Sequence, residues 1–162
     1  MSTYRTKTIS FCDKSRTIVF QNENGPCPLL ALCNYLSLTS KINIVPDNFK
    51  TVTHTYLIEL IASRIDRVKP NDENEAHQLE EALNLLPSLS VGLDVNPGFH
   101  SIFSFEFCQE LTVFDVLKIP LVHGWLIDPE DEVLNNYRSL TYNVAVEKSI
   151  SDSDVVLGGV FN

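Results

Sequence analysis

Between residues 16 and 36 the sequence changes from a strand pattern to a turn and then to a helix pattern. Residues 16–21 are rich in β-branched and aromatic side chains, which favour a strand. Asn22–Pro26 holds asparagine, glycine and proline, the residues that mark turns. Apolar residues then recur at the spacing of one helix face, at Leu29, Leu32, Cys33 and Leu36. Cys27 is therefore expected at or just before the start of a helix, where Pro28 suits the first turn.

Cys27 is placed where a thiol can act as a nucleophile. The N–H groups and the positive dipole end of a helix N-terminus stabilise a thiolate over a thiol. Six residues upstream, the Gln21 carboxamide is a hydrogen-bond donor that could reach an oxyanion beside the sulfur. The alternative is a structural role, because free cysteines are among the most buried residues, as we expect for Cys33. The turn, the flanking prolines and Gln21 together favour a cysteine hydrolase.

A nucleophilic cysteine needs a base, and histidine is the usual one. His123 is the best placed of four histidines, because it interrupts an apolar run, residues 119–128, that has a strand pattern. The alternative is a core histidine whose ring bonds a backbone partner. His54 and His77 lie on expected helices and are predicted to be surface or partly packed groups, while His100 lies in a loop and remains a candidate. A histidine on a strand that faces a cysteine at a helix N-terminus is the papain-like arrangement, an α+β fold.

Three stretches resemble one known family. The motif at residues 21–32, QNENGPCPLLAL, is similar to the catalytic cysteine motif of the MINDY family of deubiquitinases. Residues 92–96 and 114–129 also resemble that family, as do residues 140–143, which resemble a segment that opens a helix. The resemblance implies that Cys27 is the nucleophile, His123 the general base and Gln21 the oxyanion donor. It also implies that the substrates are ubiquitin and polyubiquitin chains, with a preference for the linkage that marks proteins for the proteasome.

The family's catalytic domain continues well past the segment that matches residues 140–148. We therefore expect residues 1–162 to form a single MINDY-type domain that is shortened at its C-terminus. Two alternatives stay open: a catalytically impaired ubiquitin-binding module from the same family, and another acyl-transfer enzyme on a papain-like frame, such as a transglutaminase or a peptidase.

Charge and cysteine usage restrict the partners. The net charge of −9 argues against a nucleic-acid partner, and an acidic surface suits a basic partner such as ubiquitin, although it also keeps a domain soluble. No leader or bilayer-length apolar run is present, so we expect no membrane association. The four cysteines and four histidines fit no disulfide framework or zinc site, which predicts no metal and no cofactor. Reduced thiols predict a cytoplasmic or nuclear protein, which we expect to be a monomer.

Further elements are expected along the chain. Residues 6–11 and 17–20 are predicted to form a β-hairpin, and residues 103–107 carry phenylalanines at alternate positions, as on one face of a strand. Helices are expected at about Cys27–Leu38, Thr51–Arg67, Glu75–Leu86, Thr112–Leu117 and Ser139–Ile150.

Overall fold

The computed structural model describes the backbone of residues 2–22 and 27–160, and side chains up to residue 151. The chain divides into two compact units. The first is formed by Met1–Leu93 and Gln109–Ile119, and the second by Asp94–Cys108 and Pro120–Asn162. The predicted turn at Asn22–Pro26 lies, apart from its first residue, outside the described residues.

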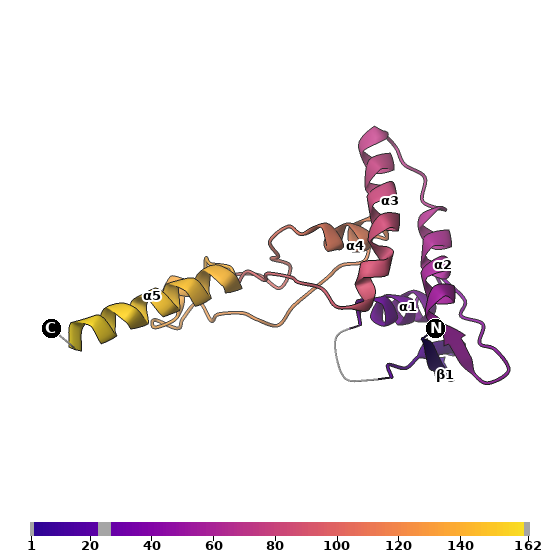
Figure 1. The fold of residues 1–162 in the computed structure, drawn as a ribbon, viewed down its shortest axis with the longest axis horizontal. Coiled ribbons are helices and arrows are strands. Elements are labelled where there is room, and N and C mark those ends of the chain that lie inside the picture. The colour runs from indigo at the N-terminus through magenta and orange to yellow at the C-terminus, as the bar shows by residue number, and fades with distance from the viewer. Residues whose placement is uncertain (1, 23–26, 161–162) are drawn as a thin grey trace. The chain divides into compact units, whose positions relative to one another are not determined.

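The first unit is built around the predicted hairpin, which is confirmed (Figure 1). Strands β1 (Thr3–Phe11) and β2 (Lys14–Val19) pair in antiparallel register from Thr6 opposite Val19 to Phe11 opposite Lys14. Both residues of the connecting turn have positive φ, 48° at Cys12 and 59° at Asp13, and such turns match the twist of paired strands. A third strand, β3 (Thr51–Thr53), pairs with the start of β1 and gives the order β2-β1-β3.

Helices follow the strands where the apolar spacing predicted them. They are α1 (Pro28–Leu38), α2 (His54–Ile65), α3 (Glu73–Leu85) and α4 (Thr112–Val116), with short 3₁₀ turns η1 (Leu86–Ser90) and η2 (Gln109–Leu111). The helix predicted from residue 51 begins three residues later, because residues 51–53 pair with β1 and the Thr53 side chain accepts a hydrogen bond from the Tyr56 N–H as the N-cap. Helices α2 and α3 lie side by side (Figure 1).

Aliphatic side chains from α1, α2, α4 and η1 close the core of the first unit. Leu29, Leu36, Leu57, Ile61, Ile65, Leu86, Leu89 and Val113 are fully buried, and the sheet adds Val19 and Val52. Cys33 is buried among them, as expected for a structural cysteine. This core fixes α1 against the sheet and so sets the position of the helix N-terminus at Cys27.

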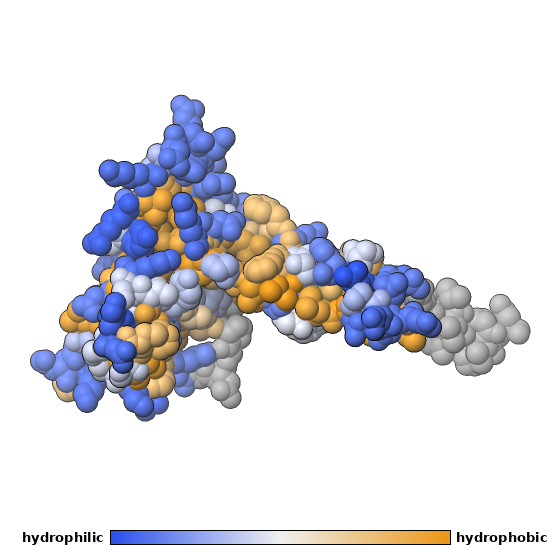
Figure 2. All heavy atoms as spheres, turned by 180° about the vertical axis from the view of Figure 1, so that it is seen from behind, coloured by the Kyte–Doolittle hydropathy of each residue, from blue (hydrophilic) through white to orange (hydrophobic). Residues whose placement is uncertain are grey.

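The second unit has little regular structure. It contains η3 (Asn135–Tyr137), α5 (Tyr142–Val160) and two isolated bridges, Pro97 with Phe105 and Gly98 with Thr141. The predicted final helix thus begins three residues later than expected. Many large apolar side chains of this unit are exposed, among them Phe103, Phe107, Trp125 and Val133. Figure 2 shows hydrophobic side chains reaching the molecular surface.

Two strand predictions for the second unit are wrong. Residues 103–107 contribute only the single bridge at Phe105, and residues 120–127 run as an irregular chain whose backbone bonds go to separate loops. The His123 N–H donates to the Ile102 carbonyl and the Ile127 N–H to the Phe99 carbonyl, so no continuous ladder forms. The fold is α+β, but among the described residues the sheet belongs to the first unit and does not carry His123.

Candidate functional site

Cys27 is the N-cap residue of α1, as the sequence predicted. Its carbonyl accepts hydrogen bonds from the N–H groups of Leu30 and Ala31 at 3.1 and 3.2 Å, and Pro28 occupies the first helical turn. The residue is half-buried and its thiol caps no N–H group of the helix. The thiol is thus attached to the positive end of the helix dipole, the position that favours a negatively charged sulfur.

Two polar side chains of α1 fasten the helix to the outer edge of β2. The Asn34 carboxamide accepts from the Val19 N–H at 2.8 Å and donates to the Val19 carbonyl at 3.0 Å. The Ser37 hydroxyl donates to the Thr17 carbonyl at 2.6 Å. Because later helix positions meet earlier strand positions, α1 runs antiparallel to β2. Its N-terminus, seven residues or about 10 Å before Asn34, therefore lies toward the end of β2 that leads into Gln21.

Gln21 lies beyond the last residue of β2, in a segment that still follows β1. The Phe20 N–H donates to the Arg5 carbonyl at 2.8 Å, and the Asn22 side chain donates to the Thr3 carbonyl at 2.7 Å. Carrying the strand register two residues past Val19 sets Gln21 opposite Tyr4. Residues opposite each other in an antiparallel pair project from the same face. Gln21 and Cys27 therefore belong to the same end of the first unit.

Tyr4 is the neighbour of Cys27 that sequence reasoning missed. Burial, followed by the charges of Cys27 and Cys33, raises the pKa of the Tyr4 phenol, so Tyr4 stays an O–H donor. Burial, with a smaller contribution from Cys27, raises the pKa of Cys33 to about 12, which makes Cys33 a poor nucleophile. The strand register could have revealed Tyr4, because Tyr4 is paired with Val52 of β3 and the register of β1 with β2 places Gln21 beside Tyr4 on the opposite edge of β1.

His54 is partly packed, as predicted. It is the first residue of α2, and its ring lies 6.4 Å from the Tyr4 ring, centroid to centroid, at a tilted angle. Its Nε2 atom is buried and has no hydrogen-bond partner among the described residues. His54 thus lies beside Tyr4 in the first unit, although nothing in the sequence indicated that it could act as a base.

His123 lies in the second unit, and its ring is held by backbone groups. Nδ1 accepts a hydrogen bond from the Trp125 N–H at 3.2 Å, and Nε2 lies 3.0 Å from the Ser104 carbonyl oxygen. A carbonyl only accepts, so Nε2 carries the proton and Nδ1 the lone pair. The Phe105 ring packs edge-on at 4.9 Å between centroids. His123 thus has the backbone partners expected under the alternative of a structural histidine, although it is half-buried and not part of a core.

The predicted residues thus divide between the two units. Cys27 and Gln21 belong to the first unit and His123 to the second. The pairing of the Cys27 thiol with the His123 imidazole stays a prediction, and so does the single domain over residues 1–162.

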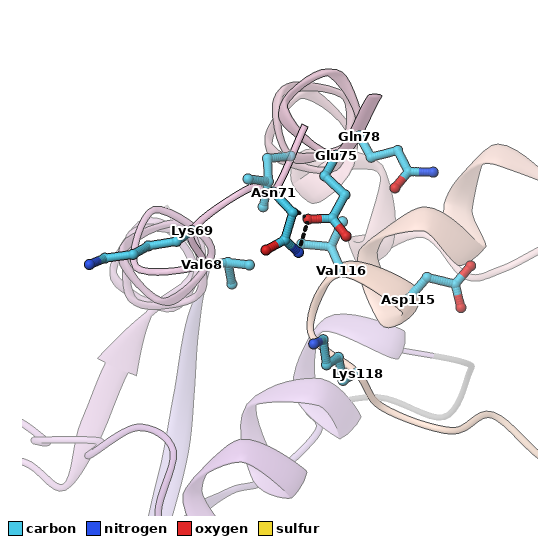
Figure 3. Close-up of a pocket in the computed structure, with 9 residues that line it drawn as sticks. Val68, Lys69, Asn71, Glu75, Gln78, Asp115, Val116 and Lys118 are labelled. Atoms are coloured by element: carbon cyan, nitrogen blue, oxygen red, sulfur yellow. Dashed lines mark hydrogen bonds between the residues drawn. The ribbon is translucent and has the colours of Figure 1, made fainter. Parts of the chain in front are cut away.

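A cavity of about 120 Å³ lies between α3, the end of α4 and the segment after α2 (Figure 3), and Cys27 is not among the residues that line it. Glu75 accepts hydrogen bonds from the backbone N–H and the side chain of Asn71, both at 2.8 Å, and Lys118 lies across the cavity from this pair (Figure 3). Its polar wall carries both signs of charge, with Lys69 and Asp115 also contributing, so it selects no single class of ligand.

The part of the chain that the structure describes has no metal-binding cluster and no membrane-spanning helix. There, no three or more His, Cys, Asp or Glu side chains gather closely enough to hold a metal ion. Within the same residues, no helix combines the length and the apolar character that crossing a bilayer requires.

Comparison with known proteins identifies relatives over more than nine-tenths of the chain. The MINDY deubiquitinase family model matches residues 2–158, which span both units. Ubiquitin carboxyl-terminal hydrolase MINDY-1 of Mus musculus is 37% identical over 169 residues, covering 97% of this chain and 36% of that protein. MINDY-1 of Danio rerio is 40% identical over 154 residues, covering 91% and 29%. MINDY-2 of Homo sapiens is 39% identical over 157 residues, covering 93% and 25%. The chain thus spans about a third or less of the length of these relatives.

Proposed function

The chain belongs to the MINDY deubiquitinase family, and we propose that it is a cysteine-type deubiquitinase that hydrolyses isopeptide bonds in polyubiquitin. The observation that carries the proposal is the family match over residues 2–158, which includes Cys27 at the N-terminus of α1. Thiol-dependent hydrolysis needs a nucleophile, a base and an oxyanion donor. Cys27, His123 and Gln21 have these roles in the proposal.

The proposed reaction begins with transfer of the Cys27 thiol proton to His123. The thiolate attacks the carbonyl carbon of the C-terminal glycine of ubiquitin, and the oxyanion accepts hydrogen bonds from the Gln21 carboxamide and the Cys27 N–H. The C–N bond then breaks, and His123 gives its proton to the departing lysine amine. A water molecule, deprotonated by His123, hydrolyses the thioester and releases ubiquitin with Cys27 restored.

The contacts of His123 indicate how its ring would serve as a base. The hydrogen bond from Nε2–H to the Ser104 carbonyl keeps the lone pair on Nδ1, and so orients the imidazole as a third catalytic group would. Nδ1 can accept the thiol proton once its hydrogen bond from the exposed Trp125 N–H, 3.2 Å away, is replaced by a hydrogen bond from the Cys27 thiol. The proposal therefore requires a local change at Trp125 and no change of tautomer.

The proposal also covers the arrangement of the catalytic groups, the ubiquitin linkage that is cleaved, and the cellular location. The proposed arrangement is papain-like, because the Cys27 thiol at a helix N-terminus meets the His123 imidazole from a separate segment. In this protein that segment is irregular and not a strand. The substrate is polyubiquitin of the linkage that marks proteins for the proteasome, which the monomeric protein cleaves in the cytoplasm or nucleus without a cofactor. The negative charge of −9 supports a basic partner.

A second candidate function is a catalytically impaired ubiquitin-binding module of the same family. One observation favours it: both ring nitrogens of His123 already have backbone partners, so the thiol lacks a free base unless the Trp125 contact is broken. Such a module would bind ubiquitin reversibly and form no covalent intermediate.

The test is the reaction of the purified protein with ubiquitin that carries a C-terminal electrophile, followed by intact-protein mass spectrometry. The wild type should gain the mass of one ubiquitin. Cys27→Ala should form no adduct, His123→Ala should react slowly, and the control Cys12→Ala, which removes an exposed thiol on the hairpin turn, should react like the wild type. A folded wild type that binds ubiquitin without forming an adduct would establish the binding module instead.

A further inference from the structure

Cationic side chains gather at one cavity of the first unit, in a chain that is strongly acidic overall. The cavity has a volume of about 230 Å³ and lies between the loop after α1 and the last turns of α2. Its polar lining is Lys41, Asn43, Ser63, Arg64 and Arg67, with two aliphatic side chains completing the wall. No acidic residue lines it. A quarter of the 12 lysines and arginines of the chain thus surround one small cavity, against 21 acidic residues elsewhere.

These cations are not neutralised by the protein. Among the described residues, none of the three forms an ion pair with a carboxylate. The acids that flank the lining stretch of α2 in the sequence, Glu59 and Asp66, are exposed and do not line the cavity. Arg64 lies in the last turn of α2, where it offsets the negative end of the helix dipole. The Lys41 ammonium lies over the Tyr35 ring, 5.5 Å from its centroid, a contact that attracts the cation but supplies no negative charge. Among the described residues, the charges of Lys41 and Arg67 thus have no carboxylate partner.

The backbone that presents Lys41 is fixed before any ligand binds. The N–H groups of Lys41 and Ile42 both donate to the Leu36 carbonyl, at 2.8 and 3.2 Å, and Ser40 has a φ of 63° that turns the chain out of the helix. The Arg16 guanidinium donates to the Ser40 hydroxyl, so a further cation lies beside this turn. On the other wall, two fully buried isoleucines hold α2 in place, Ile61 and Ile65.

We propose that this cavity, formed by Lys41, Asn43, Ser63, Arg64 and Arg67, binds the phosphate group of a ligand. Planar guanidinium groups bond phosphate oxygens in pairs, and the ammonium, hydroxyl and amide groups supply the remaining donors. A multiply charged anion also relieves the repulsion among the cations. The cavity lies past the C-terminal end of α1, and an 11-residue helix places it about 16 Å or more from Cys27. A ligand there leaves the Cys27 end open, so the inference does not depend on the proposed function.

The test is isothermal titration calorimetry at constant ionic strength with two phosphate sources. One is inorganic pyrophosphate, and the other is a short phosphoserine peptide, with the unphosphorylated peptide as its reference. The double variant Arg64→Gln/Arg67→Gln should bind at least about tenfold more weakly than the wild type, because each guanidinium contributes charge-assisted hydrogen bonds. The control Lys7→Gln/Lys14→Gln changes the net charge equally on the exposed hairpin and should bind within about twofold of the wild type.

The result decides both the site and the source of the phosphate. Binding of both ligands supports a site for phosphorylated polypeptide, and binding of pyrophosphate alone supports a site for a free phosphate compound. No measurable binding of either to the wild type overturns the proposal. An equal loss in the hairpin control also overturns it, because the attraction would then be nonspecific. Circular dichroism and urea unfolding of each variant establish that the fold is intact.

Discussion

Asn34 offers the sharpest test of how the structure positions Cys27. Its side chain satisfies both the N–H and the carbonyl of Val19, the last residue of β2, which is 3% exposed. Thr6 and Val19 face each other without exchanging backbone bonds, because the neighbouring pair Arg5 and Phe20 is the bonded one. The backbone groups of Val19 therefore point away from β1, and Asn34 is the partner that the structure gives them.

The cost of Asn34→Ala follows from these contacts. Two neutral hydrogen bonds contribute about 1 kcal/mol each to the free energy of unfolding. The two backbone groups of Val19 then lack a partner at a part-buried position, which costs about 1 kcal/mol more. Alanine recovers about 0.6 kcal/mol through its higher helix propensity. The net loss should be about 2–3 kcal/mol. Asn34→Asp should lie in the same range, because aspartate keeps the acceptor for the Val19 N–H but turns an oxygen toward the carbonyl.

The assay is urea unfolding followed by circular dichroism, with the free energy taken from the midpoint at constant slope. The matched control is Asn84→Ala, the same substitution at an exposed position of α3, which should be neutral or stabilise slightly. If Asn34→Ala and Asn84→Ala changed the free energy of unfolding equally, the Val19 contacts would not hold α1 in place. The reasoning on the position of Cys27 would then fail.

Three further outcomes are expected. The raised pKa of Cys33 means that iodoacetamide at pH 8 should modify the exposed Cys12 and spare Cys33, as peptide mass spectrometry would show. The pKa of the Cys33 thiol rises on folding from 9.0 to about 12, so its contribution to the free energy of unfolding is complete below pH 9 and is lost between pH 9 and 12. A urea midpoint that stayed constant between pH 9 and 12 would contradict this. The hydrogen bond from the Thr51 hydroxyl, and after it the bonds from backbone N–H groups, lower the pKa of Asp47, so NMR titration should place that pKa below 3.8. The free energy of unfolding should fall as acid protonates Asp47, and Asp47→Asn should remove that part of the fall. Gln21→Ala should reduce kcat for polyubiquitin cleavage by about 10²–10³ while adduct formation at saturating probe persists, whereas an unchanged kcat would remove Gln21 from the proposed mechanism.

Local patterns sufficed wherever neighbouring residues decide the structure. The hairpin follows from β-branched residues on both sides of a two-residue turn, and α1 from apolar residues at helical spacing after a proline. Cys27 falls at the helix start for the same local reason. Helix α3 begins at Glu73 and not at Glu75, because the Asp72 carboxylate accepts from the Glu75 N–H and so caps the helix earlier.

Long-range pairing explains what the sequence did not reveal. Three residues of β3 are too short for a strand pattern, and they form a strand only because β1 supplies their partners. The apolar run around His123 has a strand pattern, yet among the described residues it meets no continuous partner, so its backbone bonds go to loops. Tyr4 became visible as a neighbour of Cys27 only once the register of β1 was known. Its place depends on residues about fifty positions away, such as Val52.

The attachment of α1 along β2 also has a bearing on solubility. In most sheets an outer strand exposes a row of unpaired N–H and carbonyl groups, which can recruit a strand from another molecule. Here the Asn34 side chain bonds both backbone groups of Val19 and the Ser37 hydroxyl bonds the Thr17 carbonyl, so the helix that begins at the thiol also covers this part of the outer strand against self-association. Variants that loosen α1 should therefore aggregate through β2 before they unfold completely. Light scattering during urea unfolding should then report larger particles at urea concentrations below the unfolding midpoint.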